Sequence, residues 1–325
     1  STLAENITFD VTKPEFTQVS PVASSRVNTQ TVSWNVNENL QSGKYTWIHM
    51  GGEPDPAAPH EFNLSDDLLK PGFGDNSKLP SLNLVVNAMY RITLEGTDLA
   101  GNTGKKFVMS VVYDDIPPDL ELVYPVNNSA VNHLDISYSI SEQLNVGEIV
   151  YTRIGGVEDP NSPVSINLEA SELETSFDQP QKTAQVPMLN DGTIYNIQLF
   201  GEDLATNNAK SNVIENVKYD ITRPRISIYY PTSNSYFMGS DINIEISEDL
   251  KEGKMVWTRT GGLSDEVTKQ KIPLYDQYLK KGAYEKASLP IEESLSAGVV
   301  YSLGVDAVDL LRMKQSRCLS KISNL

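Results

Sequence analysis

The sequence has little cysteine and little histidine. Its 325 residues include one cysteine, Cys318, and three histidines, His49, His60 and His133. A single cysteine forms no intrachain disulfide and supplies no multi-cysteine zinc site. The histidines have none of the spacings of known metal-binding motifs. The sequence therefore predicts that apolar cores, and not cross-links, stabilise the fold.

Basic residues and long apolar runs are also scarce. There are 26 Lys and Arg residues against 43 Asp and Glu residues, a net charge of -17. This charge repels nucleic-acid phosphates and anionic membranes, so small cations, calcium above all, are more natural partners. No stretch approaches the roughly 18 consecutive apolar residues of a membrane span. The first residues, STLAENITFD, lack the basic and apolar regions of an export signal, so we expect a cytosolic protein or a segment without its signal.

Motifs of catalysis and nucleotide binding are missing as well. The sequence has no HExxH, no GxSxG and no GxGxxG. Carboxylates are plentiful, but a glycosidase needs two of them on either side of a cleft that holds the sugar. Acidic surface residues are mostly solvated, so the sequence favours a protein that is not an enzyme.

What the chain does have is a repeat. The phrases ENLQSGKYTWIHMGG, EQLNVGEIVYTRIGG and EDLKEGKMVWTRTGG begin at Glu38, Glu142 and Glu248, in steps of 104 and 106 residues. Two further anchors follow the same period, at Tyr90, Tyr195 and Tyr301 and at Phe9, Tyr113 and Tyr219. A period of this length is that of a whole small domain, longer than a solenoid or propeller unit.

Each repeat predicts short strands. Apolar residues alternate with polar ones just before each repeated Glu, which is typical of a half-buried strand. The alternating residues are Val32, Trp34 and Val36, then Ile136, Tyr138 and Ile140, then Ile242, Ile244 and Ile246. The next strand places Trp47, Tyr151 and Trp257 where a sandwich has its core aromatic. One short helical turn is predicted at SDDLL, ASELE and YDQYL. About seven strands per repeat predict an all-β antiparallel sandwich.

The end of the repeated phrase has a structural interpretation. His49, Arg153 and Arg259 follow the core aromatic by two residues, at the strand end, where a carboxylate or carbonyl partner is expected. The glycine pair after them predicts a bulge or a turn with positive φ.

The order W-T-R-x-G-G, Y-x-I-x-L-x-G-x-D-L-A-G-N and V-x-Y-D-x-x-P-P resembles the immunoglobulin-like or fibronectin-type-III-like repeats of large bacterial surface and secreted proteins. The resemblance implies three tandem immunoglobulin-like β-sandwich domains, at residues 11–114, 115–220 and 221–325, after the end of a preceding repeat at residues 1–10. It also implies an extracellular or cell-surface location. The third unit departs most, because DLAGN at Asp98 and DLATN at Asp203 become DLLRM at Asp309 to Met313.

Acidic residues are expected to gather at one pole of each sandwich. There the loop after the second strand, the loop after the sixth strand and the start of the first strand meet. The three sets are Asp10, Glu38 and Asp98; Asp114, Asp115, Glu142 and Asp203; and Asp220, Glu248 and Asp309. Such clusters meet half of the six to eight oxygens of a calcium ion, as in calcium-rigidified cadherin junctions. The alternative is that each acid caps a turn through its own backbone.

The last repeat has a surplus of aromatic residues. Tyr236, Tyr275, Tyr278 and Tyr284 are candidates for stacking on sugar rings, and the alternative is that they pack in the core.

The leading interpretation is a non-catalytic extracellular spacer or adhesive rod of a bacterial surface protein. Proline-containing linkers, YDDIPP and YDITRP, are expected to stiffen it. Its partners are the neighbouring repeats, with no nucleic acid and no membrane span, and calcium is the one candidate cofactor. The alternative is a module that binds polysaccharide or a host surface, as an accessory to a secreted enzyme.

Overall fold

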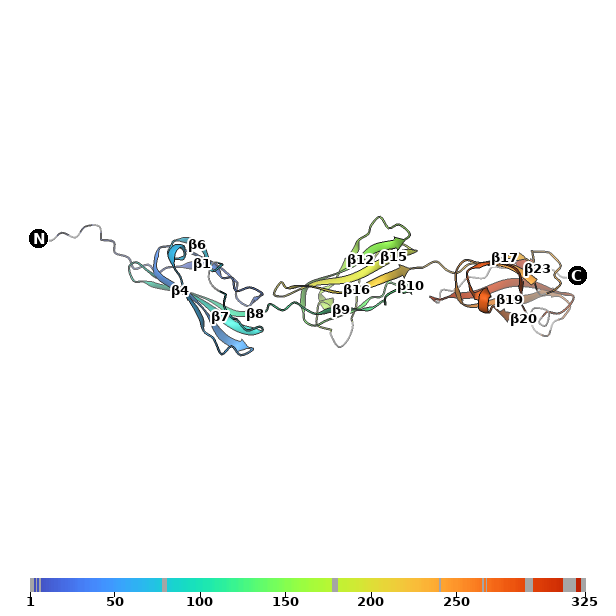
Figure 1. Ribbon diagram of the computed structural model, residues 1–325, viewed down its shortest axis with the longest axis horizontal. Helices are drawn as coiled ribbons and strands as arrows, with labels where there is room; N and C mark the ends of the chain where they lie inside the picture. Colours follow the sequence, from blue (N-terminus) through green and yellow to red (C-terminus); the bar gives the residue numbers. More distant parts are fainter. Residues whose placement is uncertain are drawn as a thin grey trace.

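The computed structural model is a row of three β-sandwiches, each with its own apolar core. The structure describes residues 3, 5, 7–77, 81–176, 181–239, 241–264, 266, 268–289, 295–311 and 320–322. Figure 1 shows the sandwiches following one another along the longest axis, with the chain ends at opposite ends of the row. Among the described residues, no helix is long and apolar enough to cross a membrane.

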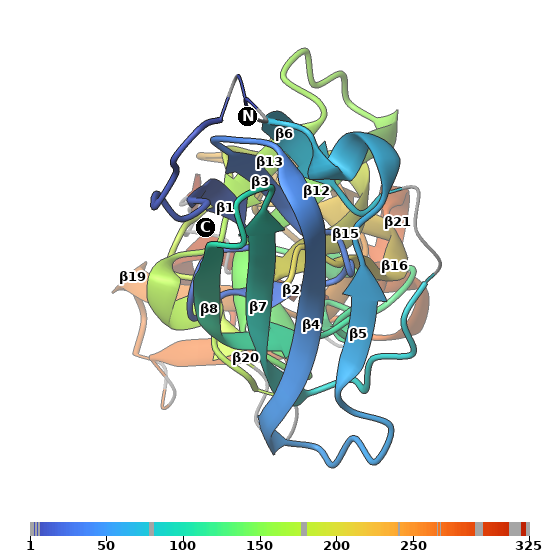
Figure 2. The same cartoon turned by 90° about the vertical axis from the view of Figure 1, so that its left-hand side faces the viewer.

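The first sandwich packs a three-stranded sheet, in the order β1-β3-β6, on a five-stranded sheet, in the order β2-β8-β7-β4-β5. Figure 2 looks along the row, with the long strands β8, β7 and β4 and the short strand β5 side by side in front. The elements are β1 (Phe16–Ser20), β2 (Arg26–Val27), β3 (Ser33–Val36), β4 (Leu40–Gly52), β5 (His60–Asn63), η1 (Asp66–Leu69), β6 (Gly72–Asp75), β7 (Ala88–Asp98) and β8 (Thr103–Tyr113).

The second sandwich repeats this topology, with the sheets β14-β11-β9 and β10-β16-β15-β12-β13. Its elements are β9 (Leu120–Tyr124), β10 (Ala130–Val131), β11 (Ser137–Ile140), β12 (Leu144–Gly156), β13 (Val164–Asn167), η2 (Ala170–Glu172), β14 (Gln181–Lys182), β15 (Thr193–Asp203) and β16 (Asn208–Tyr219). In both sandwiches the strand pairs are antiparallel except for one short parallel pair, β2 with β8 and β10 with β16.

The third sandwich has the sheets β17-β18-β21 and β20-β19-β22-β23. Its elements are β17 (Ile226–Tyr230), β18 (Asp241–Ile246), β19 (Leu250–Gly262), β20 (Lys269–Pro273), η3 (Asp276–Leu279), β21 (Gly282–Ser288), β22 (Val299–Asp309) and β23 (Ser320–Ile322). The one-turn helices η1, η2 and η3 lie in the three segments for which the sequence predicted a helical turn. The all-β sandwich prediction is confirmed.

The cores are built from the alternation that the sequence predicted. In β3, Trp34 and Val36 are buried and the residues beside them are partly exposed. The corresponding residues of β11 and β18 are buried too. Each core then contains the same aromatic pair, with the two rings nearly perpendicular and their centroids 5.6 to 6.4 Å apart. The pairs are Trp47 with Tyr90, Tyr151 with Tyr195, and Trp257 with Tyr301. Edge-to-face contact of this kind is favourable beyond the burial of the rings.

The second ring of each pair also fixes the loop before its strand. The hydroxyl of Tyr90 accepts a hydrogen bond from the backbone N–H of Val85, five residues upstream, at 2.9 Å. The hydroxyl of Tyr195 accepts the same bond from Asn190 at 3.0 Å, and that of Tyr301 accepts it from Ser296 at 3.0 Å. This is the geometry of a tyrosine corner, as found in immunoglobulin-like sandwiches.

The phrase that ends in two glycines is structural. The side chain of Arg153 donates to the carbonyl oxygens of Gly156 and Val157, at 3.1 and 2.9 Å. The side chain of Arg259 makes the same kind of bond to the carbonyl oxygen of Leu263, four residues later in the chain. A ring nitrogen of His49 lies 2.9 Å from the carbonyl oxygen of Glu53. A bulge precedes the last glycine of each phrase, and that glycine has positive φ. At Gly52 a Cβ atom would lie 2.2 Å from the carbonyl oxygen of Asn87.

Candidate metal centres at the sandwich poles

The turn between β7 and β8 is organised by one aspartate. Asp98 Oδ1 accepts hydrogen bonds from the backbone N–H groups of Ala100 and Asn102, both at 2.8 Å. Its Oδ2 accepts a bond from the side-chain amide of Asn102 at 2.9 Å. The same amide donates to the carbonyl oxygen of Asp10 at 3.2 Å, so the turn holds the segment that leads into the first sandwich.

The turn between β15 and β16 repeats this arrangement at the first junction. Asp203 Oδ1 accepts from the N–H groups of Ala205 and Asn207 at 2.7 and 2.8 Å, and its Oδ2 accepts from the Asn207 amide at 2.8 Å. That amide also donates to the carbonyl oxygens of Asp114 and Ile116, at 2.9 and 3.3 Å. Asn207 therefore connects the linker to the second sandwich.

Asn102 and Asn207 were missed by sequence reasoning as functional residues, although each is the last letter of a repeated phrase, DLAGN and DLATN. Asp98 and Asp203 cap their turns through backbone N–H groups, which is the alternative interpretation that the sequence left open for the acids. The corresponding position of the third sandwich, Met313, lies outside the described residues.

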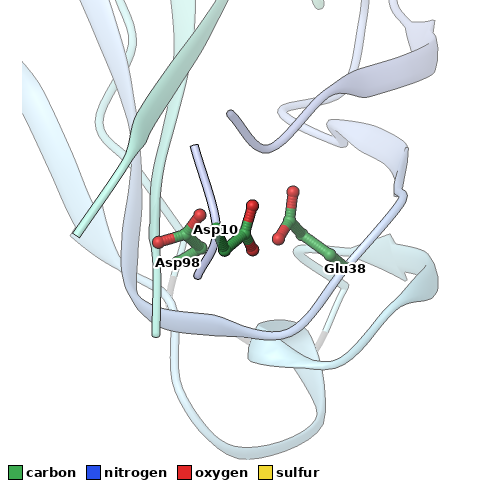
Figure 3. A group of neighbouring side chains, drawn as sticks. All are labelled: Asp10, Glu38 and Asp98. Carbon is green, nitrogen blue, oxygen red and sulfur yellow. The ribbon is translucent and has the colours of Figure 1, made fainter. Parts of the chain in front are cut away.

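Two of the three predicted acidic sets come together. In the first, carboxylate oxygens of Asp10, Glu38 and Asp98 all lie within 4.8 Å of one another. Figure 3 shows the carboxylate of Asp10 between those of Glu38 and Asp98. The second group is Asp114, Glu142 and Asp203, with the same limit on distance. Oxygens that bind one calcium ion at about 2.4 Å each lie at most about 4.8 Å apart, so both groups have a spacing that fits calcium.

Charge accumulates in the second group. Burial raises the pKa of Asp114, and the neighbouring charge of Asp203 raises it further. Burial likewise raises the pKa of Glu142, followed by the charges of Asp114 and Asp203. The Arg26 guanidinium, 3.4 Å from Asp114 Oδ2, opposes both shifts without cancelling them. A cation bound among these oxygens would remove the repulsion that these shifts express.

The first group has the same electrostatic character at a more open position. Burial raises the pKa of Glu38, and the charges of Asp98 and Asp10 add to the rise. Burial also raises the pKa of Asp98, but the hydrogen bonds from Asn102, Ala100 and Gly101 outweigh it and leave that pKa lowered. Asp98 therefore stays ionised, and the repulsion among the three carboxylates is expressed in the raised pKa of Glu38.

The third set is arranged differently. Among the described residues, Asp220, Glu248 and Asp309 do not form a group with that spacing. The ammonium of Lys218 lies 2.7 Å from Asp220 Oδ2, and this hydrogen bond, with the charges of Asp220 and Glu248, raises the pKa of Lys218. Asp115, which was expected at the first junction, accepts a hydrogen bond from the Tyr113 hydroxyl at 2.9 Å and is not part of the group.

Both junctions carry one further hydrogen bond between sandwiches. Asn28, just after β2, donates to Thr206 Oγ1 in the Asp203 turn at 3.3 Å. Asn132 holds the same position after β10, and it donates to the carbonyl oxygen of Leu311 in the third sandwich at 2.8 Å. The same residue type thus makes the same kind of contact at both junctions.

The four tyrosines proposed for sugar stacking lie in different environments. Tyr278 is in the third core with 8% of its surface exposed, and Tyr284 packs edge-on against it at 5.3 Å. The hydroxyl of Tyr284 donates to the carbonyl oxygen of Lys280 at 2.8 Å. Tyr236 and Tyr275 are exposed. Burial of the Tyr278 ring leaves it no free face for a sugar, so of the proposed four rings the partly exposed Tyr284 and the exposed Tyr236 and Tyr275 remain.

A scan against protein-family models and a search of curated proteins each gave no match. Solved structures similar to this chain include one described as giving insight into the host cell surface retention of a 1.5-MDa bacterial ice-binding adhesin. It is 12% identical, covers 96% of this chain and 98% of its own, and has a TM-score of 0.34.

The tetra-tandem repeat in the extending region of a large adhesion protein is also similar, with 12% identity, 96% and 74% coverage and a TM-score of 0.29. The fibronectin(III)-like modules of Clostridium thermocellum CbhA are 11% identical, with 64% and 94% coverage and a TM-score of 0.32. These are the kinds of repeat protein that the motifs predicted. At such identities and scores the likeness says nothing about function, and the fold follows from the strands, sheets and cores described above.

Proposed function

We propose that this chain is a non-catalytic segment of a bacterial surface protein, which acts outside the cell as a rod-like spacer or adhesive arm. The observation that carries the proposal is the repetition of one inter-sandwich contact, from Asn28 at the first junction and from Asn132 at the second. Flexibly tethered domains need no such contact. A hydrogen bond from the same donor position at both junctions favours a fixed angle between neighbours, as a spacer requires.

Calcium binding at two poles is the finer part of the proposal. At the first junction, Asp114 belongs to the linker, while Glu142 lies in the loop between β11 and β12 and Asp203 is the last residue of β15 in the second sandwich. An ion held by all three would join linker and sandwich and restrict the junction. Asp10, Glu38 and Asp98 would fix the leading segment to the first sandwich in the same way. At the second junction the Lys218 ammonium already supplies positive charge, so no third ion is proposed.

Calorimetric titration with calcium tests this part. We expect two ions per chain, with dissociation constants of about 10⁻⁴ to 10⁻³ M, the range of extracellular modules. Glu38→Gln and Glu142→Gln are each expected to lose one ion without removing a turn cap. Glu248→Gln is the matched control at the third pole, and we expect it to keep both ions. A flat titration of the unaltered chain would refute calcium binding.

Two further measurements test calcium binding and the rod-like arrangement separately. An ion at about 100 times its dissociation constant stabilises the folded state by about 2.7 kcal/mol, so thermal unfolding in calcium and in EDTA must differ by several degrees. Small-angle scattering in EDTA then tests the rod alone. A profile for three sandwiches in a row supports the spacer even where calcium has no effect, and a profile for freely jointed domains contradicts it.

A further inference from the structure

A groove of about 480 Å³ crosses the outer face of the five-stranded sheet of the second sandwich. Its side chains come from four neighbouring strands. They are Val146 and Glu148 of β12, Asn167 of β13, Phe200 and Glu202 of β15, and Lys210 of β16. The groove lies on the solvent side of the sheet, and it ends beside the acidic pole, where Glu202 directly precedes Asp203.

Two of these side chains are apolar where a solvent-facing sheet normally carries polar residues. Phe200 follows the buried Leu199 and precedes the buried Gly201, so the alternation of the strand turns its ring outward, with 38% of its surface exposed. Val146 on the paired strand β12 faces the same way, with 54% exposed. An exposed aromatic ring beside a valine, surrounded by polar groups, is typical of a binding site more than of a bare surface.

The other two sandwiches show that the fold does not require this arrangement. One repeat earlier, Glu95 stands in place of Phe200 and Ser42 in place of Val146. Glu95 makes an ion pair with Lys105 at 2.8 Å, and the hollow there shrinks to about 130 Å³. One repeat later the positions hold Asp306 and Glu252. The apolar floor is therefore specific to the second sandwich.

The rim of the groove limits what can bind on that floor. The lining of the groove has two carboxylates, Glu148 and Glu202, and one ammonium, Lys210. Its net charge is therefore negative, and an anionic ligand such as a phosphate is repelled. A purely apolar side chain of a protein partner would cover the ring but would leave two carboxylates without water and without donors, which is costly. A ligand with apolar faces and hydroxyl groups along its edges satisfies both parts.

We propose that this groove binds a neutral hexose ring of a polysaccharide. The C–H face of the pyranose lies on Phe200 and Val146, and its hydroxyl groups donate to Glu148 and Glu202. The amide of Asn145 already donates to one oxygen of Glu202 at 3.0 Å, which fixes the orientation of that carboxylate. The site differs from the tyrosines of the third sandwich. It goes beyond the rod function and does not depend on it.

The test is an array of neutral hexose oligosaccharides probed with the three-sandwich chain in EDTA, followed by titration of the best ligand. We expect Phe200→Ala to raise the dissociation constant at least about tenfold, which corresponds to about 1.4 kcal/mol. Phe200→Trp should retain binding. Glu95→Ala, at the same position of the first sandwich, is the matched control and should leave the affinity unchanged.

Three results would overturn the proposal. One is an array without signal for any neutral hexose. Another is a signal that survives Phe200→Ala, or that is lost in Tyr275→Ala instead, because the ligand then sits elsewhere. The third is binding of proteins or peptides alone through Phe200, which would make the groove a protein-docking site. Circular dichroism of each variant shows whether a loss reflects unfolding. If Phe200→Ala does not fold, Phe200→Glu, which installs the residue type of Glu95 at the same position of the first sandwich, must also lose binding.

Discussion

Removal of the Asn207 side chain tests how the first junction is built. Its amide nitrogen has two hydrogens and three acceptors, which are the Asp203 carboxylate and the carbonyl oxygens of Asp114 and Ile116. Counted as one bond to a charged group and one to a neutral group, the loss in Asn207→Ala is about 2 to 4 kcal/mol. For a sandwich of this size, that lowers the melting temperature by at least about 8 °C.

The distribution of tryptophan allows this loss to be assigned to one sandwich. Trp34 and Trp47 report on the first sandwich and Trp257 on the third, whereas the second contains no tryptophan. We therefore expect Asn207→Ala to lower a transition seen by circular dichroism while the tryptophan fluorescence transitions stay in place.

Asn102→Ala is the matched variant, because the Asn102 amide makes the corresponding bonds to Asp98 and Asp10 in the first sandwich. It should shift the fluorescence transition instead. Asn208→Ala, which removes an exposed amide beside the same turn, controls for nonspecific effects. Substitutions of ordinary surface residues change the free energy of unfolding by less than about 0.5 kcal/mol. If Asn207→Ala stays within that limit, the hydrogen bonds of the Asn207 amide do not hold the linker.

Three further predictions concern charge and the tyrosine corner. Lys218→Val gives this position the residue type of Val112, one repeat earlier, and should raise the number of calcium ions bound in a calorimetric titration from two to three. An unchanged number would mean that geometry, and not the ammonium of Lys218, prevents calcium binding at the second junction. The raised pKa of Glu142 means that the folded state binds the proton of this carboxyl more tightly than the unfolded state does. In EDTA the ionised group therefore lowers the free energy of unfolding at pH values above its folded pKa. This loss of stability is relieved as the pH falls through the folded pKa toward the ordinary glutamate value. As the pH is lowered over that range, the melting temperature of the unaltered chain should therefore rise relative to that of Glu142→Gln. Parallel curves of melting temperature against pH for the two proteins would contradict the assignment. Tyr195→Phe removes a bond to the Asp159 carboxylate at 2.6 Å and a bond from the Asn190 N–H at 3.0 Å, and should lower the free energy of unfolding by about 2 to 4 kcal/mol in urea titrations, with no change on replacing the exposed Tyr236.

Much of the fold was predictable from the sequence because its signals are local and repeated. The alternation around Trp34 or Tyr138 depends only on the two-residue period of a strand. Tyr90, Tyr195 and Tyr301 bond to the backbone five residues upstream, so each corner lies within one short phrase. Three copies of each phrase made these local patterns distinguishable from coincidence.

The sites were predicted less completely because they depend on pairing and orientation. The repeat register and the loop arrangement of an immunoglobulin-like sandwich together placed Asp114, Glu142 and Asp203 at one pole, and the structure brings them together. The same reasoning grouped Asp115 with them, although its side chain turns to Tyr113. It also treated Tyr278 as a platform, because the sequence does not show which side of η3 faces the core. Phe200 was overlooked, although the alternation of its strand already turns it outward; that it shares a groove with Val146 is visible only once the strand pairing is known.

The clearest example of such dependence is the positive charge at the two junctions. In the first sandwich Arg26 of β2 pairs with Val112 of β8, and the arginine reaches Asp114. In the second, Ala130 of β10 pairs with Lys218 of β16, and the lysine reaches Asp220.

The basic residue has thus moved from one paired strand to the other, while its acidic partner holds the same place in the repeat. The two cations are not equivalent, because the guanidinium is 3.4 Å from its carboxylate and the ammonium 2.7 Å from its own. A short charge-assisted bond competes with a metal for the same oxygen more effectively than a long one. The two junctions of one rod would then differ in their response to calcium through the exchange of one pair of neighbouring side chains.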